Sequence, residues 1–152
     1  MKKLTTIVTA ALLLFSVSAF ASNGDEVTAK VKFAFEKDFT KAKNVYWKKT
    51  DDFYFASFIM NDFIVDAAYN EEAELVGTSR KIAIVQLPLS ISLTLSQKYS
   101  DYTVSDDATE LTSNGETKYF VTVVNEKQIL RLHCISNGDV SVDKKIMTMF
   151  NF

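Results

Sequence analysis

The chain has 152 residues, of which 47% are hydrophobic and 24% are charged, and its formal net charge at pH 7 is −2. This length fits one domain with its own hydrophobic core, and the slightly acidic balance disfavours nucleic acid, whose binding depends on cationic contacts with phosphate. The single cysteine, Cys134, excludes an intramolecular disulfide, and the low glycine and proline content excludes a linker-rich or low-complexity chain.

The first 21 residues have the pattern of a secretory signal peptide. Two lysines near the start are followed by a short apolar run, residues 7–15, and then by the small-x-small sequence Ala19-Phe20-Ala21 that signal peptidase recognises. The apolar run is shorter than the about 20 residues that a transmembrane helix needs, so cleavage is a better interpretation than anchoring. A lipoprotein needs a cysteine at the cleavage point, and Cys134 lies far from it.

Cleavage of residues 1–21 leaves residues 22–152 as a single domain without a membrane anchor. Because both N-terminal lysines leave with the signal, the net charge becomes about −4. We expect this protein in the periplasm, and full secretion remains an open alternative.

The exported part of the chain is predicted to run helix, strands, helix, strands. Apolar residues recur at every fourth position and predict a first helix over 26–42, with Asp25 as its N-cap: Val27, Val31, Phe35 and Phe39. A period of two then predicts strands at 45–49, 53–60 and 63–69. A second helix is expected after Leu87-Pro88, because proline suits the first helical position. Further strands are expected at 102–105, 118–124, 128–135 and 140–145.

This order is that of an internal repeat. Tyr54-Phe55 corresponds to Tyr119-Phe120, and Lys81-Ile82 corresponds to Lys145-Ile146, at nearly the same separation. Between these pairs both halves run strand, tight turn, strand, loop, strand. The sequence therefore predicts an α+β fold of two tandem repeats, residues 25–86 and 87–152, each a helix packed on an antiparallel sheet.

The spacing of the aromatic residues resembles that of the PepSY-like family of exported bacterial proteins. The resemblance rests on Phe35, Phe39, Ala42, Val45, Trp47, Tyr54-Phe55, Tyr69, Leu87-Pro88, Tyr99 and Tyr119-Phe120. That family is similar in fold to β-lactamase-inhibitor proteins, and the resemblance implies binding or inhibition in the cell envelope without any active site to transfer. The family's Asp-Gly turn after the third strand is replaced here by Asn70-Glu71-Glu72-Ala73, whereas the second half keeps a glycine in Asn137-Gly138.

Two-residue turns fix the register of a hairpin, and the register sorts side chains by face. A turn at Asn61-Asp62 pairs Met60 with Phe63, Phe58 with Val65, Ala56 with Ala67, and Tyr54 with Tyr69. A turn at Glu126-Lys127 pairs Val123 with Leu130, Val121 with Leu132, and Tyr119 with Cys134. Both sets are uncharged, so we expect them to face the helices.

The opposite face of the sheet, which we call the outer face, is predicted to be the binding surface. It is more apolar than a solvated sheet needs, and a contiguous exposed apolar patch usually marks an interaction site. The predicted partner-binding residues are Phe53, Phe55, Ile59, Ile64, Phe120, Val124, Ile129, Arg131 and His133. Three alternatives are open for this face: an unknown protein or peptide partner, a second copy of the chain, or cover by a loop or by the segment around 105–117.

No residue pattern indicates catalysis, a cofactor or a metal. His133 and Cys134 are neighbours on a strand and point to opposite faces, so they do not form a catalytic pair. A hydrolase built on Ser57, Asp66 and His133 lacks a nucleophile elbow and an oxyanion loop. One histidine and one cysteine are too few for a zinc site, and a weak calcium site at Glu71-Glu72 with Glu74, or at Asp106-Asp107, is left as an alternative.

These observations predict an exported, non-enzymatic protein- or peptide-binding module, with inhibition as one form that such binding takes. The alternative is a structural, self-associating envelope protein that uses the outer face as a homodimer interface.

Overall fold

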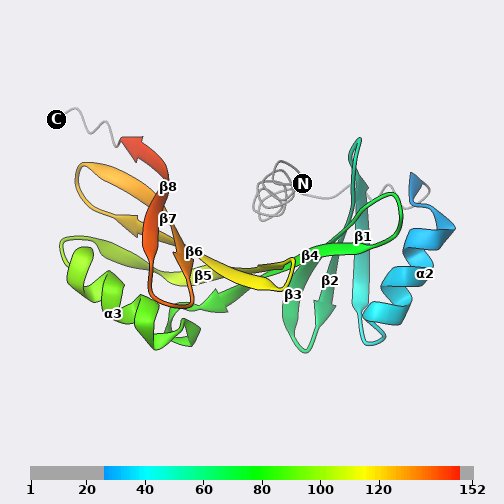
Figure 1. Cartoon of the computed structure of the whole chain (residues 1–152), viewed down its shortest axis with the longest axis horizontal. Coiled ribbons are helices and arrows are strands. Elements are labelled where there is room, and N and C mark those ends of the chain that lie inside the picture. The colour runs from blue at the N-terminus through cyan, green and yellow to red at the C-terminus, as the bar shows by residue number, and fades with distance from the viewer. Residues whose placement is uncertain (1–25, 148–152) are drawn as a thin grey trace. The chain divides into compact units, whose positions relative to one another are not determined.

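The structure is a computed structural model that describes residues 26–147 (Figure 1). The predicted signal peptide and the predicted N-cap Asp25 lie outside these residues. The elements in chain order are α2 (Ala29–Asp38), β1 (Lys43–Lys49), β2 (Tyr54–Met60), β3 (Phe63–Tyr69), β4 (Leu75–Ala83), the 3-10 turn η3 (Ile84–Gln86), α3 (Leu89–Lys98), β5 (Thr103–Ser113), β6 (Glu116–Val124), β7 (Gln128–Ile135) and β8 (Val140–Met147). The strands form one eight-stranded sheet in the order β1-β2-β3-β4-β5-β6-β7-β8, so the predicted α+β class is confirmed.

The described residues divide into two compact units. Unit 1 holds residues 26–80 and 111–115, and unit 2 holds residues 81–110 and 116–147. In this part of the chain no helix is long and apolar enough to cross a membrane.

In unit 1, α2 packs on β1, β2 and β3 and covers the core (Figure 1). The helix is shorter than predicted because its N-cap is Thr28, whose Oγ1 accepts a hydrogen bond from the backbone N–H of Val31 at 3.3 Å. It ends at Asp38, where the backbone N–H of Phe39 donates to the carbonyl of Phe35. The Phe35 ring lies edge-on to Trp47 and Phe58, with ring centroids 5.2 and 5.0 Å apart.

The predicted register of the β2–β3 hairpin is confirmed. Asn61 and Asp62 both have positive φ, 51° and 67°, which matches the right-handed twist of the flanking strands in a two-residue turn. All four predicted pairs form: Met60 with Phe63, Phe58 with Val65, Ala56 with Ala67, and Tyr54 with Tyr69. Six of the eight side chains are buried under α2, and only Met60 and Phe63, beside the turn, reach solvent.

The turn after β3, whose geometry the sequence left open, closes without a glycine. The N–H of Asn70 donates to the carbonyl of Glu74, and the N–H of Ala73 donates to the carbonyl of Asn70. Ala73 takes the left-handed conformation, with φ 63°, at the place where the corresponding turn after β7 has Gly138 with φ 97°. That turn has the same two hydrogen bonds, from Ile135 to Asp139 and from Gly138 to Ile135.

In unit 2, α3 covers a second core. Pro88 was predicted to be the first residue of the helix, but it is the N-cap, and the helix begins at Leu89. The buried residues of this core are Ile82, Leu87, Ile91, Leu95, Ala108, Tyr119, Val121, Val123, Leu130, Leu132 and Cys134. The predicted β6–β7 pairs are confirmed, with Val123 opposite Leu130, Val121 opposite Leu132, and Tyr119 opposite Cys134.

The prediction was wrong about the segment around 105–117. β5 does not stop near residue 105 but continues to Ser113, and β6 starts at Glu116 after the two-residue connection Asn114-Gly115. Aspartate has low strand propensity, so Asp106 and Asp107 led to the prediction that the strand ends near residue 105. Pairing within the sheet overrides that propensity. The Asn-Gly pair between β5 and β6 is a strong hairpin signal, and both residues have positive φ, 53° and 75°.

Candidate protein-binding surface

The outer face of unit 1 carries one polar row that crosses four strands. Register places Tyr46 of β1 beside Ser57, Ser57 beside Asp66, and Asp66 beside Ser79 of β4. Ser57 is hydrogen-bonded to the Asp66 carboxylate. Partial burial raises the pKa of Asp66 above its usual value, and the hydrogen bond from Ser57 opposes that shift. The row therefore places one partly desolvated carboxyl group on a face that is otherwise mostly apolar.

The aromatic residues beside this row are not exposed, which corrects the predicted patch. Phe55 is only 2% exposed, and Phe53 and Ala68 are buried as well. None of them belongs to the core under α2, so they are covered on the outer side of the sheet. Leu111, from the segment 105–117 that was one of the alternative covers, is also buried and belongs to unit 1. At these positions intramolecular cover replaces the exposed surface that the alternation of residues had predicted.

The accessible part of the outer face lies next to the hairpin turns. In unit 1 the second pair from the turn is Ile59 with Ile64, and Ile64 is 67% exposed. In unit 2 the pair in the same hairpin position is Val124 with Ile129, and β8 extends this row with Ile146. Val124 and Ile146 are exposed, whereas Ile59 and Ile129 are partly covered. Each unit thus presents an apolar cross-strand pair to solvent.

In unit 2 the predicted anchor Phe120 is the centre of a packed cluster. It is 6% exposed, the Arg131 guanidinium lies 5.8 Å from its ring centroid, and the His133 ring lies 5.4 Å from it. Arg131 Nε donates to Asp143 Oδ2 at 2.5 Å. The β7–β8 bulge between Arg131 and Leu132 leaves Asp143 outside the regular pairing, beside Arg131. Arg131 is therefore already neutralised within the chain.

His133 is partly buried in the same cluster. Desolvation lowers its pKa below the usual value, the neighbouring Lys118 lowers it further, and Asp143 acts in the opposite direction. The imidazole is thus mainly neutral at pH 7 and contacts an aromatic ring. Its adjacent residue Cys134 lies in the core on the other face, as predicted.

The residues weighed for catalysis are not arranged for it in the described part of the chain. Ser57 and Asp66 lie opposite each other in unit 1, as predicted, and Ser57 is hydrogen-bonded to a carboxylate and not to an imidazole. Burial raises the pKa of the Cys134 thiol to about 11, which disfavours the nucleophilic thiolate.

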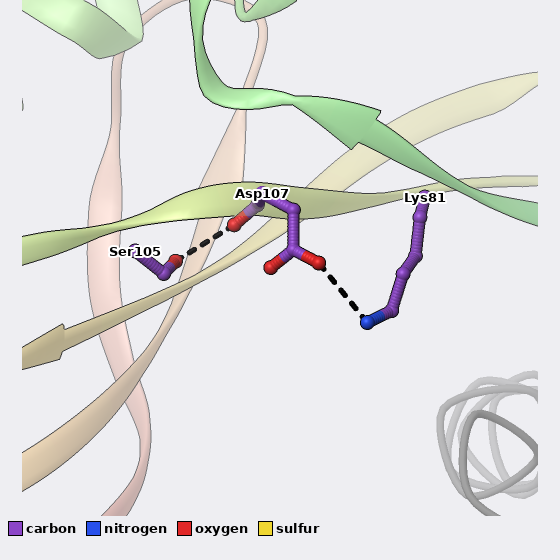
Figure 2. Close-up of polar contacts among 3 residues, drawn as sticks. All are labelled: Lys81, Ser105 and Asp107. Atoms are coloured by element: carbon purple, nitrogen blue, oxygen red, sulfur yellow. Dashed lines mark hydrogen bonds and ion pairs between the residues drawn. The ribbon is translucent and has the colours of Figure 1, made fainter.

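The acidic stretches form contacts within the chain. Asp107 pairs with Lys81 at 3.0 Å, and the Ser105 hydroxyl donates to the Asp107 backbone carbonyl at 2.7 Å (Figure 2). Glu74 accepts a hydrogen bond from the Asn70 side chain at 2.8 Å. Within residues 26–147 no group of three or more histidine, cysteine, aspartate or glutamate side chains is placed to hold a metal ion.

A pocket of about 350 Å³ lies between α2 and the edge strand β1. Its lining residues are Lys32, Phe35, Glu36, Phe39, Thr40, Ala42, Val45 and Trp47. The sequence did not indicate this pocket, because the same aromatic residues were expected to pack the core, and Phe35 and Trp47 do so. One lysine and one glutamate line it, so its charge does not select a ligand class.

The sequence also missed Tyr46 and Ile146 as members of the accessible outer face. Both are exposed. The register of β1 on β2, and of β8 on β7, would have placed them there, but the bulge in each pairing shifts the register and only the structure locates it.

Two helices and one antiparallel sheet in this order define an α+β protein, and its fold is BLIP-like by comparison with solved structures. No family model matches the chain, and no curated protein matches it. Among solved structures it is similar to a BLIP-like protein from Bacteroides fragilis, with a TM-score of 0.69, 18% identity, and coverage of 82% of this chain and 90% of that chain. A DUF2874 family protein from Bacteroides ovatus has a TM-score of 0.69 and 22% identity, with 82% and 89% covered. A proposed periplasmic protein from Bacteroides eggerthii has a TM-score of 0.68 and 17% identity, with 80% and 88% covered.

Proposed function

We propose that the chain is a non-enzymatic protein- or peptide-binding module of the cell envelope, exported by its N-terminal signal and released into the periplasm. The observation that carries the proposal is the apolar cross-strand pair beside each hairpin turn, Ile59 with Ile64 and Val124 with Ile129, in which Ile64 and Val124 are exposed. In unit 1 such a patch lies next to the polar row of Tyr46, Ser57 and Asp66, and an apolar anchor beside a few fixed polar groups is the usual composition of a binding surface.

Two tandem helix-plus-sheet repeats of the PepSY-like kind are the architecture that we propose for this module. The turns at 70–74 and 135–139 have the same pair of backbone hydrogen bonds. The two helices also end alike, because the N–H of Phe39 donates to Phe35 in α2 and that of Tyr99 donates to Leu95 in α3. A repeat explains why the accessible apolar pair falls in the same hairpin position in each unit.

The polar groups have different roles in this proposal. Asp66 has a partly desolvated carboxyl group, and a partner's cationic or hydrogen-bonding group would stabilise its charged form. Arg131 and His133 were predicted to orient the partner, and their contacts support a second role, in which they hold Phe120 in place beneath the surface. The homodimer alternative through the outer face loses its largest anchors, because Phe53, Phe55 and Phe120 are buried within the chain.

Site-specific photo-cross-linking in the native host tests this function. A photoreactive phenylalanine analogue is introduced at Ile64, at Val124 or, as a control, at Phe33 on α2, which is 72% exposed against 67% for Ile64 and 37% for Val124. We expect a discrete adduct with one envelope protein from the first two positions and none from Phe33. Adducts from Phe33 alone, or the absence of any adduct from Ile64 and Val124, would show that the outer face is not the binding surface.

Asp66→Asn provides the second readout. It keeps the size of the side chain and one acceptor oxygen, replaces the other oxygen by an NH2 donor, and removes the ionisable group. If Asp66 contacts the partner, the adduct yield from Ile64 falls while the folded state is retained. An unchanged yield assigns recognition to the apolar pairs alone.

A further inference from the structure

The segment that forms α3 has an unusual composition for the surface of this protein. Residues 82–97 contain no charged side chain, although 24% of the whole chain is charged. This run spans the end of β4, the 3-10 turn η3 and all of α3 except its last residue, Lys98. Solvated helix faces normally carry charges, so this composition calls for an explanation other than solvation.

The outward side of α3 is apolar over its first two turns and ends in Ser96 and Gln97. Leu89 is 74% exposed and Leu93 is 51% exposed, and residues four apart in a helix lie on the same side. Val85, in the turn that leads into the helix, is exposed as well. The opposite side carries Ile91 and Leu95, which are buried in the core of unit 2. A helix that is apolar on both sides is typical of a helix covered on both sides.

The hydroxyl groups of α3 are already satisfied within the chain. Each hydroxyl donates to a backbone carbonyl at 2.6 to 3.5 Å: Ser90 to that of Ser136, Ser92 to that of Pro88, Thr94 to those of Ser90 and Gly138, and Ser96 to that of Leu93. Burying a hydroxyl without a partner is costly, whereas burying one that keeps its hydrogen bond costs little. Water can therefore leave these hydroxyl groups without stranding a donor.

The helix of unit 1 gives the contrast. Phe33 on α2 is 72% exposed, so a large exposed apolar residue is not special to α3. Around it, however, α2 carries Lys30, Lys32, Glu36 and Lys37. Those charges keep α2 hydrated, and α3 has no equivalent of them.

We infer that the outer side of α3, formed by Val85, Leu89 and Leu93, is the contact surface between two copies of this chain. In a two-fold contact the residues near the axis meet their own copies, so a charge there would face its own sign, and a face without charges avoids that repulsion. A different protein partner is normally selected through complementary charges. An anionic lipid surface is selected through lysine and arginine on the helix, and α3 has only Lys98 at its end.

The contact is small, which predicts its strength. A pair of ten-residue helices that meet through two or three apolar side chains buries much less than the about 1,200–2,000 Å² of a standard stable interface. The dimer is therefore weak and forms at high local concentration. Within unit 2, α3 lies over the core and therefore on the side of the sheet opposite the outer face, so the inference does not depend on the function proposed above.

Sedimentation velocity on the purified protein, from about 1 to 300 µM, brackets the range in which an interface of this size associates. We expect the wild type to shift from monomer to dimer, the Leu89→Ser/Leu93→Ser variant to dimerise at least about tenfold more weakly, and the control Phe33→Ser to match the wild type. A wild type that stays monomeric over the whole range overturns the inference, and so does a dimer that the double variant retains.

Disulfide trapping adds a positional test, because the only native cysteine, Cys134, is buried and its thiol has a raised pKa. Near a two-fold axis Leu93 meets its own copy, so Leu93→Cys should form a covalent dimer under mild oxidation while Phe33→Cys stays monomeric. Equal trapping of both variants would mean random collision and would contradict the assignment. Flotation of the monomer with anionic lipid vesicles, lost in the Leu89→Ser/Leu93→Ser variant, would instead assign the face to a membrane.

Discussion

Replacement of Phe55 by alanine is the sharpest test of how the outer face is covered. Phe55 is 2% exposed, lies between Lys48 and Ala68 across the strands, and has the Phe53 ring at 6.2 Å between centroids. Removing a fully buried phenylalanine side chain costs about 3–5 kcal/mol, from lost burial and from the cavity that remains. That is a large part of the about 5–15 kcal/mol that separates folded from unfolded domains.

The assay is urea unfolding followed by the fluorescence of Trp47, the only tryptophan, which is buried in unit 1 beside the same strands. The matched control is Ile64→Ala, on the same face but exposed, for which we expect a change within about 0.5 kcal/mol. If Phe55→Ala also changes the free energy of unfolding by less than about 1 kcal/mol, Phe55 is solvated in solution and the exposed aromatic patch predicted from sequence is restored.

Three further measurements test separate features. Ala73→Gly should raise the free energy of unfolding by about 1 kcal/mol, because Ala73 has φ 63° and glycine adopts that conformation without strain. Gly138→Ala should lower the free energy of unfolding, because Gly138 has φ 97° and a Cβ there would lie 3.0 Å from the Ser90 carbonyl oxygen. Equal effects of the two changes would contradict this account. Tyr69→Phe should cost about 1–2 kcal/mol, because the buried Tyr69 hydroxyl donates to Asp38 at 2.9 Å, and a neutral result would mean that the bond adds nothing in solution. The pKa of His133 is lowered below 6.5 in the folded state, so its contribution to stability is full above pH 6.5 and is lost as the pH falls through the folded pKa. The free energy of unfolding should therefore change less between about pH 7.5 and pH 5 in His133→Gln than in the wild type. An identical change in both proteins would exclude His133 as the cause.

Local sequence determined the hairpins. A strand alternates its side chains with a period of two, so once Asn61-Asp62 is the turn, every partner in β2 and β3 follows, and the same holds for β6 and β7. The core faces followed with them, because an uncharged set of paired residues has one stable position, beneath a helix. These features depend on neighbours within a few residues, and that is why the sequence alone contains them.

Tertiary structure decided which of these faces meets water. Alternation placed Phe55 and Phe120 on the outer face correctly, yet both are covered, Phe120 by Arg131 and His133 from the neighbouring strand. Solvent access depends on which groups, remote in sequence, pack over a side chain, and no local period encodes that. For the same reason the sequence did not predict the full length of β5, because its aspartates are typical of a loop and only its pairing in the sheet makes it a strand. Nor did the sequence identify the exposed apolar side of α3, because that side is defined only by the burial of Ile91 and Leu95 on the opposite side.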